Sequence, residues 1–299
     1  MKAILCNKIG PNSPEYFNIG WRVPYDHLEK LGWRSLEQKD NFWSNNFSTV
    51  LFWNVNSWIK NNWDKIMEAQ FLKMIYFDDI HQKKSIAIFR RKIINHFDRI
   101  LATYAYLFPR VFSDVPKVAE KVVWLPHFIR DEFWVPYQPD PLPRILLSGT
   151  IESNIYPFRY QVSQMTHNYP IDILPHMGYR KQRHDIIGHK YIEHLSRYLV
   201  GFTCCSNKSY LLAKFFEIPA SGALLLAYEA PIREQLQALG FIEGKNYLAV
   251  DTHNLRERIQ YVLDPKNRPV INQIRQQGYQ LVWSKHKMSD RARLIDSIS

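Results

Sequence analysis

The side chains best suited to chemistry lie within Tyr210–Tyr228, YLLAKFFEIPASGALLLAY. Lys214 and Glu217 stand there in an otherwise apolar stretch. A carboxylate in apolar surroundings must be paired or must serve a ligand, because burying its charge is costly. From spacing alone, Glu217 either binds Lys214 or backbone amides at a helix end, or accepts hydrogen bonds from a ligand.

Polar residues precede this stretch in the loop Cys204–Ser209, CCSNKS. We predict a helix over residues 209–216, and backbone amides at a helix N-terminus favour an anion. The alternative is a capped helix with a solvated lysine. Together with Lys214, the candidate anion-binding side chains are Ser206, Asn207, Lys208 and Ser209.

A second candidate phosphate site lies in residues 147–159, LSGTIESNIYPFR. Gly149 lets the backbone approach a phosphate, and Thr150 continues the same loop. Arg159 follows on the next predicted helix, where its guanidinium could donate two hydrogen bonds to a diphosphate. The alternative for Arg159 is an ion pair with a surface carboxylate.

Two carboxylates and a histidine end a buried strand in the N-terminal half, in the sequence YFDDIH. A hydroxyl is deprotonated only by a base within hydrogen-bond reach. Asp79 is our first choice for that base, with Asp78 and His81 as the others. An aspartate at this place is equally suited to cap a helix. The adjacent pair is not a spaced D-x-D, so we predict no metal site here.

Two further residues follow strands at this end of the predicted sheet. His127 comes after residues 122–125, and Arg22 follows the loop after the first strand. Both are candidates for binding an acceptor, although a lone histidine near a strand end is more often structural. His184, His189 and His194 are spaced by five, which places them on different faces of a helix and argues against a metal site.

Short apolar strands alternate with amphipathic helices along the whole chain, which predicts an α/β fold with parallel sheets. In the first half we expect helices over 25–31, 57–70 and 83–96. The strands expected with them are residues 2–6, 48–53, 73–77, 99–103 and 122–125.

Residues 133–144, FWVPYQPDPLPR, contain four prolines and are predicted to be an interdomain linker. The two domains would then span 1–135 and 136–299, with ligands bound at the carboxyl ends of the strands in a cleft between them. In the second domain we expect helices over 158–168, 188–195, 209–216, 231–239 and 255–263. The expected strands are residues 144–148, 171–174, 200–204, 222–227 and 247–250.

The sequence KFFEIPASGALLLA resembles the nucleotide-sugar motif of GT-B glycosyltransferases, in the group-1-like family that includes the spore-maturation CgeB-like proteins. That family has (F/L)EIPA-x-G-A, in which Glu217 matches the glutamate that binds the donor ribose. Residues 147–159 and 240–250 resemble further family segments, as does His286 with Arg291–Ala292. Related retaining enzymes have a second glutamate eight positions earlier, where this chain has Ser209.

The resemblance implies two Rossmann-like domains facing each other across a cleft, with the last helix packing back on the N-terminal domain. It implies a hexosyl- or pentosyltransferase that moves a sugar from a UDP- or GDP-linked donor to a hydroxyl of a glycan or glycoconjugate. We expect no cofactor and no metal, and we favour inversion because of Ser209. The alternative is a non-catalytic glycan- or nucleotide-binding protein on the same fold.

The composition excludes several classes of protein. The 299 residues are 46% hydrophobic and 22% charged, which excludes a mainly disordered chain. Three cysteines give no disulfide framework, and no apolar run approaches the roughly 20 residues of a membrane span. We therefore expect a cytoplasmic protein without an integral membrane segment.

The net charge of +11 favours anionic partners. The basic residues of the chain are spread along its whole length, which argues against nucleic acid as the partner. Peripheral contact with a membrane stays open.

Overall fold

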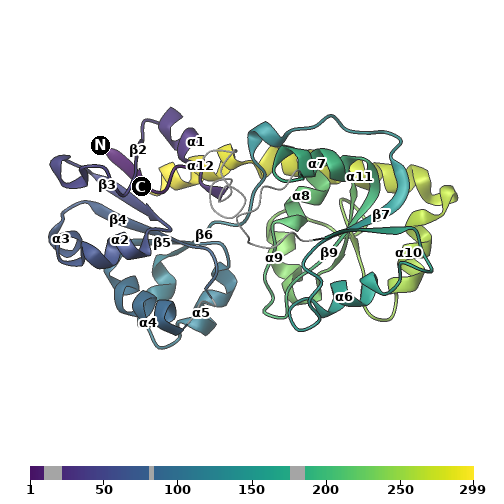
Figure 1. The fold of residues 1–299 in the computed structure, drawn as a ribbon, viewed down its shortest axis with the longest axis horizontal. Helices are drawn as coiled ribbons and strands as arrows, with labels where there is room; N and C mark the ends of the chain where they lie inside the picture. Colours follow the sequence, from purple (N-terminus) through teal and green to yellow (C-terminus); the bar gives the residue numbers. More distant parts are fainter. Residues whose placement is uncertain (10–21, 81–83, 176–185) are drawn as a thin grey trace. The chain divides into compact units, whose positions relative to one another are not determined.

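The computed structural model describes residues 1–9, 22–80, 84–175 and 186–299. The chain folds into two compact units (Figure 1). Unit 1 comprises Met1–Pro126 and Met288–Ser299, and unit 2 comprises His127–Lys287. The division after Pro126 lies nine residues before the boundary that the proline-rich segment suggested.

Unit 1 is built on a parallel sheet of six strands in the order β2-β1-β3-β4-β5-β6. Ile4 of the buried first strand lies opposite Ser35 on one side and Leu51 on the other. The edge strand β2 was not predicted, because three residues of mixed polarity give no periodic signal. The strands are β1 (Lys2–Leu5), β2 (Arg34–Leu36), β3 (Thr49–Trp53), β4 (Leu72–Phe77), β5 (Arg99–Ala102) and β6 (Val122–Trp124).

The last helix of the chain belongs to unit 1. It packs beside the first helix, as its yellow ribbon in Figure 1 shows, and buries Ala292 and Ile295 in the same core as Leu28. The helix predicted over 57–70 is two short helices, which meet at Asn62. The α-helices of unit 1 are α1 (Tyr25–Lys30), α2 (Asn56–Asn61), α3 (Trp63–Glu68), α4 (Lys84–Ile93), α5 (Phe108–Val111) and α12 (Met288–Ser297).

Unit 2 contains a second parallel sheet, with five strands in the order β11-β10-β9-β7-β8. Apolar side chains such as Ile145, Phe202 and Leu226 form its core. The two α/β units with parallel sheets confirm the predicted fold class. The strands are β7 (Leu142–Gly149), β8 (Ile171–Pro175), β9 (Tyr198–Cys204), β10 (Leu224–Tyr228) and β11 (Leu248–Ala249).

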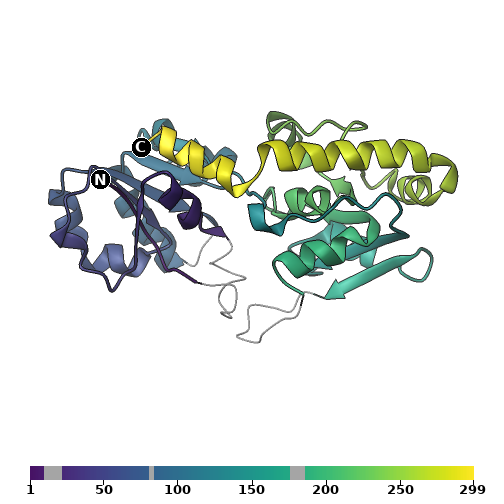
Figure 2. The same cartoon turned by 90° about the horizontal axis from the view of Figure 1, so that it is seen from above.

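The α-helices of unit 2 are α6 (Pro157–Ser163), α7 (His189–Ser196), α8 (Lys214–Ala220), α9 (Arg233–Ala238), α10 (Leu255–Leu263) and α11 (Arg268–Lys285). The long helix α11, clear in Figure 2, packs on α8 and β10. The prediction of a helix over 209–216 was wrong, since α8 begins only at Lys214. Ser209 has a left-handed φ of 58°, which an α-helix cannot include. Within the described ranges, no helix is long and apolar enough to cross a membrane.

The proline-rich segment 133–144 is not a free linker, because it is fastened to unit 2. Arg275 of α11, only 1% exposed, donates hydrogen bonds to the carbonyl oxygens of Gln138 at 2.8 Å and Gly222 at 2.9 Å. The hydroxyl of Tyr279 donates to the carbonyl oxygen of Val135 at 2.7 Å. These bonds explain why the division between the units precedes the prolines.

Candidate functional site

Two cations meet at the carboxyl end of the first strand of unit 2. Gly149 ends β7 with a left-handed φ of +98°. A Cβ atom at this position would lie 2.8 Å from Lys214 Cε and 3.0 Å from Arg159 Nη1. A glycine is therefore needed both for the backbone conformation and for the approach of the two cationic side chains.

Arg159 is the more deeply buried cation, with only 2% of its surface exposed. Its Nη1 donates to the backbone carbonyl oxygen of Thr150 at 2.9 Å, and its Nη2 lies 3.4 Å from Thr203 Oγ1. The guanidinium also lies over the ring of Tyr156, at 4.3 Å from the ring centroid. The side chain is thus held inside unit 2 and is not the surface ion pair that was the alternative.

Lys214, the first residue of α8, is held by a tyrosine from α7. Its Nζ donates to the hydroxyl oxygen of Tyr191 at 2.7 Å, and that hydroxyl lies 2.6 Å from Ser148 Oγ. Glu217 Oε2 lies 3.6 Å from the same Nζ. Burial lowers the pKa of Lys214, but Tyr191 and Glu217 outweigh this effect, so the pKa lies above its ordinary value.

The charges of this cluster do not balance. Arg159 and Lys214 are two cations, whereas Glu217 is a single carboxylate, and all three side chains are largely buried. Buried charges are stable when they are paired. The cluster therefore suits an anionic ligand at the carboxyl edge of the sheet, where open parallel sheets bind ligands.

Glu217 keeps its capacity to accept hydrogen bonds. It lies on the first turn of α8 with 13% of its side chain exposed. The 3.6 Å to Lys214 Nζ exceeds a normal hydrogen-bond length. Its carboxylate oxygens remain able to bind hydroxyl groups of a ligand beside the two cations.

The loop 204–209 does not form the predicted helix N-terminus, because four residues separate Ser209 from α8. Ser206 Oγ accepts hydrogen bonds from the amides of Lys208 and Tyr210, at 3.3 and 3.4 Å. Asn207 Nδ2 donates to the carbonyl oxygen of Asn154 at 2.6 Å. The two loops that follow β7 and β9 are thus tied together, while the side chain of Lys208 is exposed.

A second polar cluster lies at the carboxyl end of β4 in unit 1. Arg22 Nη1 donates to Asp78 Oδ2 at 2.6 Å, whereas Asp78 Oδ1 is buried without a hydrogen-bond partner in the structure described here. Tyr76 precedes it with its hydroxyl 2.8 Å from Thr103 Oγ1. Burial lowers the pKa of Arg22, but the carboxylate of Asp78 outweighs this effect and raises the pKa above its ordinary value.

The other predicted residues of the N-terminal half are placed differently. Asp79 is half-buried, and its carbonyl oxygen accepts a hydrogen bond from Arg90 Nη1 at 2.6 Å. His81 lies outside the described residues. His127, expected on the N-terminal side, is buried at the start of unit 2. Arg22 and Asp78, proposed for separate roles, form one ion pair.

His286, which the family resemblance singled out, lies in the interior of unit 2. His286 is 3% exposed, lies 2.8 Å from the carbonyl oxygen of Leu239 through Nε2, and stacks on Phe241. This contact gives it a structural role. His184 lies outside the described residues. Among those that are described, no group of three histidine, cysteine, aspartate or glutamate side chains could hold a metal ion.

Sequence reasoning missed three residues that position the cations, namely Tyr191, Ser148 and Thr203. Ser148 and Thr203 lie near the carboxyl ends of β7 and β9, so their positions in buried strands could have marked them. Tyr191 carries no such signal, because it lies in a helix whose spacing indicates only an apolar face.

Residues 159–297 match the family model described as glycosyl transferase-like. No curated protein matches the chain in sequence. Two similar solved structures are HepE from Anabaena in complex with UDP and glucose, and a glycosyltransferase from Rickettsia africae. The chain is 10% identical to each, with TM-scores of 0.62 and 0.58. The aligned regions cover 100% of this chain and 99% of HepE, and 99% of this chain and 97% of the Rickettsia protein.

A third similar structure is sucrose-phosphate synthase from Thermosynechococcus elongatus, which is 12% identical with a TM-score of 0.56. The alignment covers 84% of this chain and 73% of that protein. Likeness at this level of identity concerns the fold, and it agrees with the two parallel sheets. The chain thus has the GT-B fold, and the part of it that matches the glycosyl transferase-like family model begins at Arg159 of α6.

Proposed function

We propose that the protein is a glycosyltransferase that moves a sugar from a nucleotide diphosphate donor to a hydroxyl of a glycan or glycoconjugate. The observation that carries this proposal is the cluster of Arg159, Lys214 and Glu217 around Gly149. It offers two cations for a diphosphate and one carboxylate for hydroxyl groups, at the edge of the sheet where such folds bind ligands. The match of residues 159–297, which include Arg159, Lys214 and Glu217, to the glycosyl transferase-like family model supports it.

Each residue of the cluster then has a role on the donor. Lys214 and Arg159 would stabilise the negative charge that builds on the diphosphate as it leaves. Glu217 would accept hydrogen bonds from the ribose hydroxyls, because its ion pair with Lys214 at 3.6 Å is longer than a hydrogen bond. With two cations already held for the leaving group, we propose a reaction without a metal ion. UDP is the first donor nucleotide to test, because HepE was solved with UDP and glucose; GDP is the second.

The acceptor would bind to unit 1, with Arg22 and Asp78 shaping its site and Asp79 acting as the base. In an inverting transfer, the acceptor oxygen forms a bond to the anomeric carbon while the bond from that carbon to the diphosphate oxygen breaks. The acceptor proton passes to the base. Inversion is favoured by Ser209, which stands where related retaining enzymes have a glutamate. Hexosyl and pentosyl donors are both compatible with this proposal.

Thermal unfolding with UDP, GDP, ADP, CMP and TDP, with EDTA present, tests the donor site. A ligand at 100 times its Kd adds about 2.7 kcal/mol of stability. We expect one diphosphate to raise the Tm of the protein. Glu217→Ala should weaken its binding by about 1–3 kcal/mol, which is roughly 5- to 150-fold. Glu234→Ala, an exposed glutamate of α9, is the matched control and should bind normally. A Tm that none of the five nucleotides changes would contradict the proposal.

A second candidate function is non-catalytic binding of a nucleotide or glycan on the same fold. Ser209 favours it, since the glutamate of related retaining enzymes is missing there. Release of nucleoside diphosphate from a bound donor separates the two functions. A binding protein would bind the donor tightly and release no diphosphate in the presence of any acceptor.

A further inference from the structure

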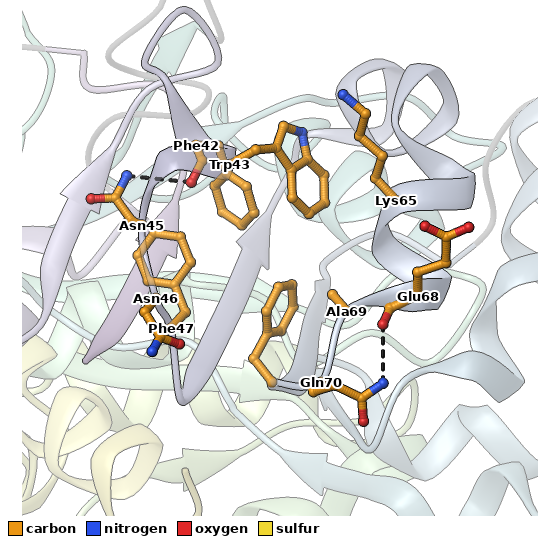
Figure 3. A pocket seen from close by; sticks show the side chains of 10 residues that line it. Phe42, Trp43, Asn45, Asn46, Phe47, Lys65, Glu68, Ala69 and Gln70 are labelled. Carbon is orange, nitrogen blue, oxygen red and sulfur yellow. Dashed lines mark hydrogen bonds between the residues drawn. The ribbon is translucent and has the colours of Figure 1, made fainter.

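Unit 1 has a pocket at the end of its sheet where strands β3 and β4 begin. Asp78 lies at the opposite end, where β4 finishes. Phe47, labelled in Figure 3, precedes β3 and borders the pocket. Phe71 precedes β4 and also belongs to the lining. Since β4 has six residues, its two ends are about 20 Å apart. The volume of about 540 Å³ is that of a small-molecule site. The lining consists of Phe42, Trp43, Asn45, Asn46, Phe47, Lys65, Glu68, Ala69, Gln70 and Phe71.

An indole ring of this pocket is held in a fixed orientation while part of it stays exposed. Trp43 stacks on Trp58, with ring centroids 5.9 Å apart and planes at 15°. Its Nε1 donates to Asn62 Oδ1 at 3.1 Å. Phe42 packs edge-on against it at 4.8 Å. A ring fixed in this way can bind a ligand with little further loss of conformational entropy.

Unused polar groups lie around the aromatic lining. Asn46 and Glu68 are exposed, and the side chain of neither makes a hydrogen bond within the described residues. By contrast, Asn45 Oδ1 already accepts from Arg34, and Gln70 Nε2 donates to the carbonyl oxygen of Glu68. In Figure 3, Lys65 of α3 lies beside the indole of Trp43, and its Nζ is over that ring at 5.8 Å from the centroid. Glu68 lies one turn further along the same helix.

We propose that this pocket binds a sugar unit of a neutral glycan. A pyranose ring has an apolar C–H face, which suits the indole of Trp43, and hydroxyl groups around its rim. The amide of Asn46 can donate and accept hydrogen bonds, and the carboxylate of Glu68 accepts them. Lys65 and Glu68 carry opposite charges in the same lining, so an anionic ligand such as a phosphate gains no net attraction. The chemistry therefore favours a neutral saccharide.

The place of the pocket gives it a role distinct from catalysis. A sugar bound where the strands begin cannot present its hydroxyl to Asp79, which lies beyond the carboxyl end of β4. It would instead hold a distant unit of an extended acceptor, an assignment that rests on the proposed function. Binding of the glycan itself does not depend on transfer, so the two can be tested apart.

Saturation-transfer NMR of the full chain tests the site without any nucleotide. The probes are maltohexaose, cellohexaose, mannohexaose and chitohexaose. We expect transfer to at least one of them and an affinity at least tenfold lower in Trp43→Ala. The double variant Asn46→Ala/Glu68→Ala changes only exposed side chains, and its affinity for the hexasaccharide should also be at least tenfold lower. Asn61→Ala/Asp64→Ala is the matched control on α2 and α3 and should bind like the parent protein.

The proposal is overturned if none of the four hexasaccharides receives saturation, or if both pocket variants bind as tightly as the control. The proposed donor site can be tested separately from this pocket. Lys214→Ala should abolish the thermal shift by a nucleoside diphosphate and leave hexasaccharide binding unchanged, whereas Trp43→Ala should do the reverse.

Discussion

The Nζ atom of Lys214 lies 2.7 Å from the hydroxyl oxygen of Tyr191, and 4.5 Å from the centroid of the same ring. Because the phenol oxygen accepts from Lys214, its proton can be donated to Ser148 Oγ at 2.6 Å. Burial raises the pKa of Tyr191, so this proton is retained at neutral pH. One tyrosine thereby fixes a lysine of α8 against the end of β7.

The substitution Tyr191→Phe tests this link, since it removes only the hydroxyl. Lys214 loses one hydrogen bond and becomes less well ordered. We expect the affinity for the nucleoside diphosphate to fall by about 1 kcal/mol, roughly fivefold, as measured by titration calorimetry. Tyr160→Phe, at an exposed position of α6, is the control and should have no effect. Parent-like affinity in Tyr191→Phe would mean that Lys214 is positioned without this bond.

The substitution Gly149→Ala should harm the site in two ways. An alanine at a φ of +98° is strained by about 1–2 kcal/mol, and its Cβ would displace the side chains of Lys214 and Arg159. Gly244→Ala is the matched control, because Gly244 has a φ of +74° and no atom within 4 Å of the added Cβ. We expect both variants to unfold at lower temperature and only Gly149→Ala to lose diphosphate affinity, by at least tenfold. Equal affinities in both would show that the cations are not displaced.

The sequence was most informative where short apolar runs stand between polar residues. The buried strands β3, β4 and β9 were predicted for this reason, whereas the role of Glu217 was inferred from the resemblance of its motif to a known family. The start of α8 was placed wrongly, because Tyr210–Leu212 are apolar and continue a helical pattern. The left-handed turn at Ser209 prevents a helix there, and a serine gives no sequence signal for that conformation.

Contacts between distant residues could not be predicted in the same way. The proline-rich segment 133–144 has the composition of a linker, yet it is bound to Arg275 more than 130 residues later. The pairing of Lys214 with Tyr191 likewise joins two helices that local periodicity treats separately. Both depend on how the elements of unit 2 pack together, whereas propensity and spacing describe only residues that are close in the sequence.

Arg275→Ala should destabilise unit 2. It removes a 1% exposed guanidinium and leaves the carbonyl oxygens of Gln138 and Gly222 without that donor. We expect a loss of about 3 kcal/mol in the free energy of unfolding, measured in urea. Arg268→Ala, at the start of the same helix, should change stability by less than about 0.5 kcal/mol. If the two variants unfold alike, the segment 133–144 is held by other contacts.

The acid stability of unit 1 should depend on Asp296 of α12. Its carboxylate accepts hydrogen bonds from Lys2 Nζ and Trp33 Nε1, both at 2.8 Å, which lower its pKa below the usual value of about 3.9. A lowered pKa stabilises the fold at higher pH, and this stabilisation is lost as the pH falls through the folded-state pKa. Asp296→Asn should therefore cost about 1 kcal/mol at pH 7 and progressively less below pH 4.

Urea unfolding of the parent and the variant between pH 7 and pH 2.5 measures this difference. Asp64→Asn, at an exposed aspartate of α3, should give no pH-dependent difference. A constant difference between the parent and Asp296→Asn across the whole range would mean that the two hydrogen bonds do not depend on the charge of the carboxylate.

Asp78 and Asp79, which follow β4, should have different roles: Asp78 should stabilise the fold, and Asp79 should act in turnover. Asp78 is half of an ion pair with Arg22, so Asp78→Asn should lower the Tm and perturb the acceptor site. Asp79→Asn leaves that pair intact. If Asp79 is the base, its loss should lower turnover by about 10²–10⁴-fold while diphosphate affinity and Tm stay close to those of the parent.

Diphosphate release, diphosphate affinity and Tm measured on both variants assign the base, because each aspartate gives a different combination. A low turnover with normal Tm in Asp79→Asn supports Asp79. Normal turnover in Asp79→Asn, together with lost turnover at an unchanged Tm in Asp78→Asn, transfers the role to Asp78. Its buried Oδ1 has no hydrogen-bond partner within the described residues and could then accept the proton while Oδ2 stays on Arg22.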